Sequence, residues 1–135
     1  MPTIAWEERF SVNVDKIDRQ HQHLFRLFNQ LQEAIIAKQG QEALALIVDE
    51  MVDYTLTHFA TEEKYMLAYD YPELADHKAE HEVFTGKALE LQSRIRNDEF
   101  ILSLEVLRFL SDWIAEHICT SDQRYSRHFN AAGLR

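Results

Sequence analysis

A chain of 135 residues is long enough for one domain with a full hydrophobic core and too short for two. Its formal net charge of -9 disfavours nucleic acid and anionic membrane surfaces as partners, because both repel an acidic protein. Three glycines and two prolines supply few turn signals, which disfavours a sheet of many short strands and favours a few long helices.

The compartment is predicted from two features of the sequence. The single cysteine, Cys119, cannot form a disulfide within the chain, which fits a reducing compartment. The N-terminal residues include no apolar segment typical of a signal peptide, and no uncharged apolar run approaches the length that spans a membrane. We therefore expect a cytoplasmic protein without membrane insertion.

The N-terminal part of the chain predicts an arm followed by the first helix. Residues 1–16 contain apolar side chains without a helical period, so we expect an extended arm over the core. A helix is expected at about residues 17–38, ended by Gly40. Its apolar stripe is Ile17, His21, Leu24, Phe28, Leu31 and Ile35. This stripe places His21 in a core position, whereas His23 lies off it and is expected at the surface.

A second helix is expected at about residues 41–67, and its core face includes two polar residues. The stripe is Leu44, Val48, Met51, Thr55, His58, Glu62 and Tyr65. A buried carboxylate without a partner is destabilising, so we expect a cation to face Glu62.

Pro72 begins a third helix, expected at about residues 73–96. The stripe is Leu74, His77, His81, Phe84, Ala88, Leu91 and Ile95. His77 and His81 are four residues apart and therefore leave the same helix face one turn apart. That separation suits two ligands of one metal ion.

A fourth helix is expected at about residues 100–128, and its register changes after His117. The regular period predicts Ser121 as the next inward residue, but Asp122 and Tyr125 are better candidates and come one residue late. On a regular helix, His117 and Asp122 diverge by about 140°. Either the two side chains flank a shared target from two sides, or a π-helical turn brings them into line. The sequence leaves both alternatives open.

Four amphipathic helices with short connections predict an all-α fold, an up-down-up-down antiparallel four-helix bundle that forms a single domain over residues 1–135. Seven polar residues occupy its core positions: His21, His58, Glu62, His77, His81, His117 and Asp122. Helical backbone offers few free hydrogen-bond partners for so many buried polar groups. We therefore predict that all seven are metal ligands.

The ligand types and their number indicate two ions of a first-row metal. A single tetrahedral zinc ion would use about four ligands and leave the others without a partner. Imidazoles with carboxylates, and no thiolate, suit iron or a similar metal. If both carboxylates and one oxo or hydroxo oxygen bridge two octahedral ions, about eleven of about twelve ligand positions are filled. One position remains open for a small ligand.

Four segments, residues 17–21, 58–63, 77–81 and 117–122, resemble the signature segments of the hemerythrin family, in the same order and along nearly the whole chain. The resemblance implies a non-haem di-iron site with an oxo or hydroxo bridge that binds dioxygen reversibly. It implies that His77, His81 and His117 hold one iron and that His21 and His58 hold the other. Glu62 and Asp122 would bridge the two irons. The open position then belongs to the second iron.

The resemblance also implies a function in oxygen carriage, storage or delivery, with no enzymatic activity and with an oxygen-consuming protein as a partner. The family's dioxygen pocket maps onto Leu24, Phe59, Trp113, Ile114 and Ile118. These apolar side chains would exclude water, although all five also fit an ordinary core. Ile114 stands where leucine is common in the family.

Two other functions compete with oxygen carriage: an oxygen or redox sensing module, and a di-iron enzyme that acts on peroxide or nitric oxide.

Two residues near the predicted ligands are expected to have no part in the site. His128 lies near the end of the bundle and is expected at the surface. Cys119 follows His117 by two residues, points to another side of the helix, and is expected to be a packed thiol.

Overall fold

The computed structural model describes residues 4–135, except for the side chains of residues 100–102. Its long helices are α1 (Asp15–Ile36), α2 (Gln41–Ala68), α3 (Leu74–Arg96) and α4 (Phe100–His117). Its short elements are the 3-10 helix η1 (Glu8–Phe10), the π-helix η2 (Ile118–Asp122) and helix α5 (Gln123–Ala131). Within residues 4–135 the structure contains no strand.

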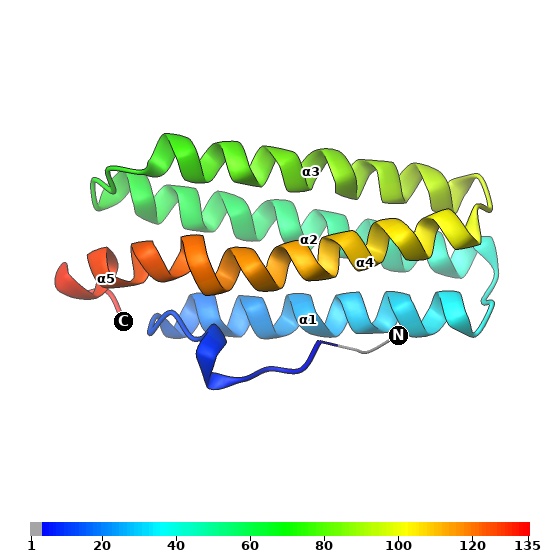
Figure 1. Cartoon of the computed structure of the whole chain (residues 1–135), viewed down its shortest axis with the longest axis horizontal. Coiled ribbons are helices and arrows are strands. Elements are labelled where there is room, and N and C mark those ends of the chain that lie inside the picture. The colour runs from blue at the N-terminus through cyan, green and yellow to red at the C-terminus, as the bar shows by residue number, and fades with distance from the viewer. Residues whose placement is uncertain (1–3) are drawn as a thin grey trace.

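The four long helices lie side by side and form a bundle (Figure 1). Helix α1 packs against α2 and α4, and α3 packs against the other sides of α2 and α4. Because only a few residues join consecutive helices, neighbouring helices run antiparallel. The predicted up-down-up-down four-helix bundle is therefore confirmed. Helix α5 continues α4 beyond the π-helix (Figure 1).

The buried apolar side chains form two clusters along the bundle. The main cluster includes Leu24, Phe28, Met51, Phe84, Leu91 and Leu110. The end cluster consists of Val12, Val14, Ile17, Met66, Tyr71, Tyr125 and Phe129. In α1, His21 lies between Ile17 of the end cluster and Leu24 of the main cluster. Glu62 in α2 and Asp122 in the π-helix likewise lie between residues of the two clusters along the chain. The buried polar residues thus form a layer between two apolar clusters.

The turns between the helices contain non-glycine residues in the left-handed conformation. Lys38 follows α1 with a φ of 56°, and Asp70 and Asp98 follow α2 and α3 with φ values of 53° and 57°. The prediction that Gly40 ends the first helix is wrong. Helix α1 ends at Ile36, and Gly40, with a φ of -62°, is instead the N-cap residue of α2.

The predicted N-terminal arm runs along α1 (Figure 1), and its residues 1–3 lie outside the described part of the chain. The Asp18 carboxylate accepts hydrogen bonds from the Val12 N–H at 2.8 Å and the Ser11 hydroxyl at 2.6 Å. On the other side, the Gln123 amide donates to the Ser11 carbonyl at 3.0 Å, and the Ser126 hydroxyl donates to the Val12 carbonyl at 2.6 Å. The arm therefore joins the start of α1 to α5.

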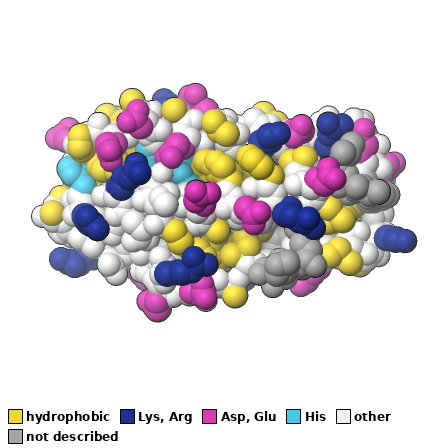
Figure 2. Space-filling model, viewed as in Figure 1, with side chains coloured by type: hydrophobic (Ala, Val, Ile, Leu, Met, Phe, Trp, Pro, Cys, Tyr) yellow, Lys and Arg dark blue, Asp and Glu magenta, His cyan; other side chains and the backbone are white. Residues whose placement is uncertain are grey.

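On the molecular face shown in Figure 2, cationic and anionic side chains are interspersed. Among the described residues, none of the helices has the length and apolar character needed to cross a membrane. Most of the large apolar side chains are instead buried between the helices, where their removal from water stabilises the bundle.

Candidate metal centre

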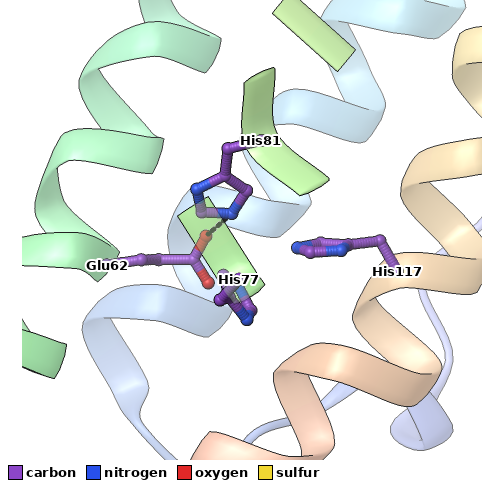
Figure 3. A group of neighbouring side chains, drawn as sticks. All are labelled: Glu62, His77, His81 and His117. Carbon is purple, nitrogen blue, oxygen red and sulfur yellow. Dashed lines mark ion pairs between the residues drawn. The ribbon is translucent and has the colours of Figure 1, made fainter. Parts of the chain in front are cut away.

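The seven predicted ligands come from all four long helices and the π-helix and lie in one buried layer. The exposed fraction of each is 4% or less. Donor atoms of Glu62, His77, His81 and His117 lie within 4.8 Å of one another. Figure 3 shows the side chains of this group. Donor atoms of His21, His58 and Glu62 form a second such group. Glu62 belongs to both groups, which we call the three-histidine group and the two-histidine group.

Helical spacing and aromatic contacts orient these histidines. His58 and Glu62 on α2, like His77 and His81 on α3, are four residues apart and leave one helix face. The Phe59 ring stacks on His81 with ring centroids 3.8 Å apart and an interplanar angle of 4°. Such contacts restrict the rotation of the imidazole and hold its Nε2 atom toward the centre of the bundle.

The π-helix brings Asp122 into the same layer as His117. Helix α4 ends at His117, and the five residues Ile118–Asp122 form the wider π-helical turn. Asp122 and Tyr125 are consequently buried, with exposed fractions of 1% and 0%. Of the two alternatives that the sequence left open, the π-helical turn is therefore confirmed.

Each buried carboxylate contacts histidines of both groups. The Glu62 Oε1 atom lies 3.1 Å from His58 Nε2 and 3.4 Å from His81 Nε2. The Asp122 Oδ1 atom lies 3.1 Å from the Nε2 atoms of both His77 and His117, and its Oδ2 atom lies 3.2 Å from His21 Nε2. Both carboxylates thus occupy the positions that bridging ligands of two ions require.

The protonation of the imidazole rings indicates that a cation belongs between these groups. His58 Nδ1 lies 2.6 Å from the amide oxygen Oε1 of Gln20, which can only accept, so Nδ1 carries the proton. In the neutral ring, Nε2 then directs a lone pair at the Glu62 carboxylate. The Nε2 atoms of all five histidines are buried without a hydrogen-bond partner among the described residues. The lone pair of His58 and the Glu62 carboxylate repel each other unless a metal ion lies between them, so this donor set fits a metal.

Electrostatics leads to the same conclusion. Burial lowers the pKa of His58, which is therefore neutral at pH 7. Burial opposes ionisation of Asp122, but His117 holds the pKa of this carboxyl well below its usual range. Conversely, Asp122 outweighs the effect of burial on His117 and raises its pKa. The layer therefore favours positive charge near two ionised carboxylates, and a metal cation supplies such charge.

The structure also identifies residues behind the ligands to which the sequence analysis assigned no role. Gln20 faces His58, Glu63 Oε2 lies 2.9 Å from His81 Nδ1, and Glu80 Oε2 lies 3.6 Å from His117 Nδ1. The Tyr125 hydroxyl donates to Glu62 Oε2. These partners join different helices, so helix periodicity along one segment does not reveal them. The only available signal was that Gln20, Glu63 and Glu80 each stand directly beside a predicted ligand in the sequence.

The five predicted pocket residues all belong to the apolar core next to the ligands. Leu24, Phe59, Ile114 and Ile118 are buried in the main cluster. Trp113 packs against that cluster, and its ring stacks on His117 with a centroid distance of 4.5 Å. These contacts show an apolar wall beside the ligand layer, while its role as a dioxygen pocket stays a prediction.

The remaining histidines and the cysteine lie outside the ligand layer. His23 is partly exposed and its ring packs on Tyr54, with centroids 4.3 Å apart. His128 is also partly exposed, and its Nε2 atom faces the Tyr69 carbonyl. Cys119 is a free, partly buried thiol that packs against the main cluster, with its Sγ atom 3.7 Å from Arg9 Nη1.

The chain resembles known proteins along most of its length. Residues 12–128 match the Hemerythrin HHE cation binding domain. The chain is 37% identical over 131 residues to a bacteriohemerythrin of Stenotrophomonas maltophilia, with 97% of this chain and 84% of that protein covered. It is 31% identical over 126 residues to a bacteriohemerythrin of Methylococcus capsulatus, with 93% and 95% covered. A crystal structure of wild-type hemerythrin matches with a TM-score of 0.84 at 30% identity, covering 93% of this chain and 97% of that chain. The chain therefore belongs to the hemerythrin family.

Proposed function

We propose that this protein binds dioxygen reversibly at a pair of non-haem iron ions and serves in oxygen carriage, storage or delivery. The family to which it belongs is a di-iron, oxygen-binding family. The observation that carries the proposal is the buried set of five histidines and two carboxylates, in which each carboxylate contacts both histidine groups. Such a set supplies ligands for two ions rather than one.

The ligand set supports binding rather than oxidation chemistry. His77, His81 and His117 would hold one iron, His21 and His58 the other, and Glu62 and Asp122 would bridge them. When bound, the two iron ions would supply the electrons that hold dioxygen. Five neutral imidazoles and only two carboxylates donate less negative charge than a carboxylate-rich set, which disfavours highly oxidised iron.

The apolar wall would protect the bound gas. Leu24, Phe59 and Ile118 are at most 3% exposed, so they exclude water and small anions from the layer beside the ligands. Ile114 adds a β-branched side chain to this wall and, with Trp113 above His117, sets its shape. This wall leaves little room for an organic substrate, so we propose a binding protein rather than an enzyme. An oxygen-consuming protein would be the recipient.

The test is an absorption spectrum of iron-loaded, reduced protein recorded without air, then in air, then under argon. We expect a visible band that appears in air and disappears under argon over repeated cycles. We also expect about two irons per chain and one dioxygen per pair of irons.

Three outcomes would contradict the proposal. A sample that contains one iron per chain after full loading lacks the proposed site. A band that persists under argon shows irreversible oxidation. Steady consumption of dioxygen with an organic substrate, or of peroxide or nitric oxide, beyond one equivalent per pair of irons, shows an enzyme.

A further inference from the structure

The Nε2 atoms of the five histidines face the centre of the layer, so the other ring nitrogen, Nδ1, is free to meet a partner behind each ligand. Such partners orient the ring, and an anionic partner also makes the imidazole a stronger electron donor. The partners differ in charge between the two groups. This difference distinguishes two ion positions that have similar inner ligands.

Carboxylates stand behind the three-histidine group. Glu63 Oε2 lies 2.9 Å from His81 Nδ1 and accepts a hydrogen bond from it. Glu80 Oε2 lies 3.6 Å from His117 Nδ1, too far for a hydrogen bond but close enough for its negative charge to act on the ring. The Ser121 hydroxyl donates to Glu80 Oε1 at 2.8 Å and holds it in place. Ser121 belongs to the π-helix, so the turn that buries Asp122 also supports this outer carboxylate.

Among the described residues, no carboxylate contacts the Nδ1 atoms of the two-histidine group. His58 Nδ1 donates to the neutral amide oxygen of Gln20 at 2.6 Å. His21 Nδ1 is buried and has no hydrogen-bond partner among the described residues. The two groups therefore differ in outer charge, although Glu62 and Asp122 serve both of them.

We propose that Glu63, supported by Glu80, makes the ion on the three-histidine group the more readily oxidised of the two, whereas Gln20 keeps the ion on the two-histidine group the more readily reduced. A negative charge behind a ligand stabilises the more positive oxidation state of the metal. Gln20 would thereby preserve the ferrous form of the ion that is expected to have the open position. This inference rests on the pair of irons in the proposed function.

The test is a spectroelectrochemical titration of iron-loaded protein, in which the two one-electron steps are resolved. Glu63→Gln removes the outer charge while retaining an acceptor, and we expect it to raise the lower of the two potentials. Gln20→Glu adds a charge behind His58, and we expect it to lower the higher potential. Each shift is expected to reach about tenfold in the equilibrium constant, or about 59 mV for one electron. Both variants therefore bring the two steps closer together.

The control is Glu82→Gln, which makes the same charge change at an exposed residue next to His81 in α3. We expect it to leave the separation of the two steps unchanged. Gln20→Glu keeps the test decisive if Glu63→Gln does not fold. If Glu63→Gln and Gln20→Glu hold two irons per chain and bind dioxygen reversibly, but the separation of their two potentials is unchanged or wider, this inference alone is overturned. Fewer than two irons in the unmodified protein would overturn the proposed function as well.

Discussion

The position of one nitrogen atom decides how each histidine of the core behaves. His58 directs its protonated Nδ1 to Gln20, which leaves the Nε2 lone pair 3.1 Å from the Glu62 carboxylate. An isolated buried histidine would instead use both nitrogens in hydrogen bonds. The arrangement of the ring therefore suits a cation in the layer, which links the local hydrogen bond to the proposed metal binding.

Substitution of single histidines separates ligands from other histidines. We expect His58→Ala, and likewise Glu62→Ala, to lower iron retention by about tenfold or more, because each removes a donor from the buried layer. His23→Ala is the matched control, because His23 packs on Tyr54 outside the layer and should leave the iron content unchanged. Iron per chain is measured after gel filtration. Equal iron content in the three variants would refute the ligand assignment.

Tyr125→Phe tests the hydroxyl behind Glu62. The variant leaves Glu62 Oε2 without its buried donor, and we expect it to lower the free energy of unfolding by about 1–3 kcal/mol. Burial, with Asp122 and Glu62, raises the pKa of Tyr125 well above 10. A raised pKa in the folded state means that this stabilisation is fully present below about pH 10 and is lost at higher pH.

Denaturant unfolding of both proteins across pH measures this contribution. The difference in unfolding free energy should be constant from about pH 6 to 9 and should shrink above about pH 10. Tyr65→Phe is the control, because Tyr65 is partly exposed at the edge of the end cluster, and it should change stability by less than about 0.5 kcal/mol. A difference that grows above pH 10 would contradict the assigned role of Tyr125.

At the scale of the helices, periodicity predicted the elements well and their ends less well. Apolar stripes located all four long helices because burial of one face repeats along a helix. The ends differ: α1 begins at Asp15 rather than at about residue 17, and the last helical segment extends to Ala131. Lys38 carries no sequence signal for its left-handed conformation, which accompanies the hydrogen bond from the Gln39 N–H to the Ala34 carbonyl at the end of α1.

The π-helix marks the limit of the same method. The spacing of His117 and Asp122 showed that a regular helix fails, but it could not choose between two solutions. The outer partners were still less accessible, because Gln20 and His58 meet across two helices and are separated by 38 positions in the chain. Such contacts depend on how the helices are rotated about their axes, which a single sequence does not state.

The attachment of the arm gives a prediction about α1. Asp18 accepts hydrogen bonds from Val12 and Ser11, and α1 lacks a side-chain cap at its first turn. We expect Asp18→Ala to lower the free energy of unfolding by about 1–2 kcal/mol. We also expect it to increase amide hydrogen exchange in residues 8–14, because the arm loses its anchor on this helix.

Asp15→Ala is the control for this variant. Asp15 pairs with Arg19 at 2.9 Å on the exposed surface of the same turn, and such pairs contribute less than about 0.5 kcal/mol. Exchange in the arm should therefore remain as in the unmodified protein. If Asp15→Ala and Asp18→Ala changed exchange and stability equally, the loss of charge rather than the loss of the arm contacts would be the cause.

At the scale of the whole molecule, the ligand layer separates two apolar clusters that contain none of the predicted ligands. The main cluster fills the bundle on one side of the layer, and the end cluster joins the arm, α2 and α5 on the other. The sequence predicted this layer because seven polar residues occupied core positions of otherwise apolar stripes. The folded bundle therefore combines an apolar framework with one layer of buried groups that could hold a metal.

Removal of iron should destabilise that layer selectively. A chelator would leave the Nε2 atoms of five histidines and two ionised carboxylates buried without a cation, which disfavours the folded state. If free iron exceeds its dissociation constant by about a hundredfold at each of the two ion positions, the loss is about 2.7 kcal/mol per ion and about 5.4 kcal/mol for the pair. For a chain of this size we expect the Tm to fall by about 20 °C. Hydrogen exchange should rise most in the segments around His58, His81 and Asp122, and least in the main cluster. Chelator saturated with iron beforehand is the control, and an unchanged Tm after complete iron removal would show that the layer is stable without metal.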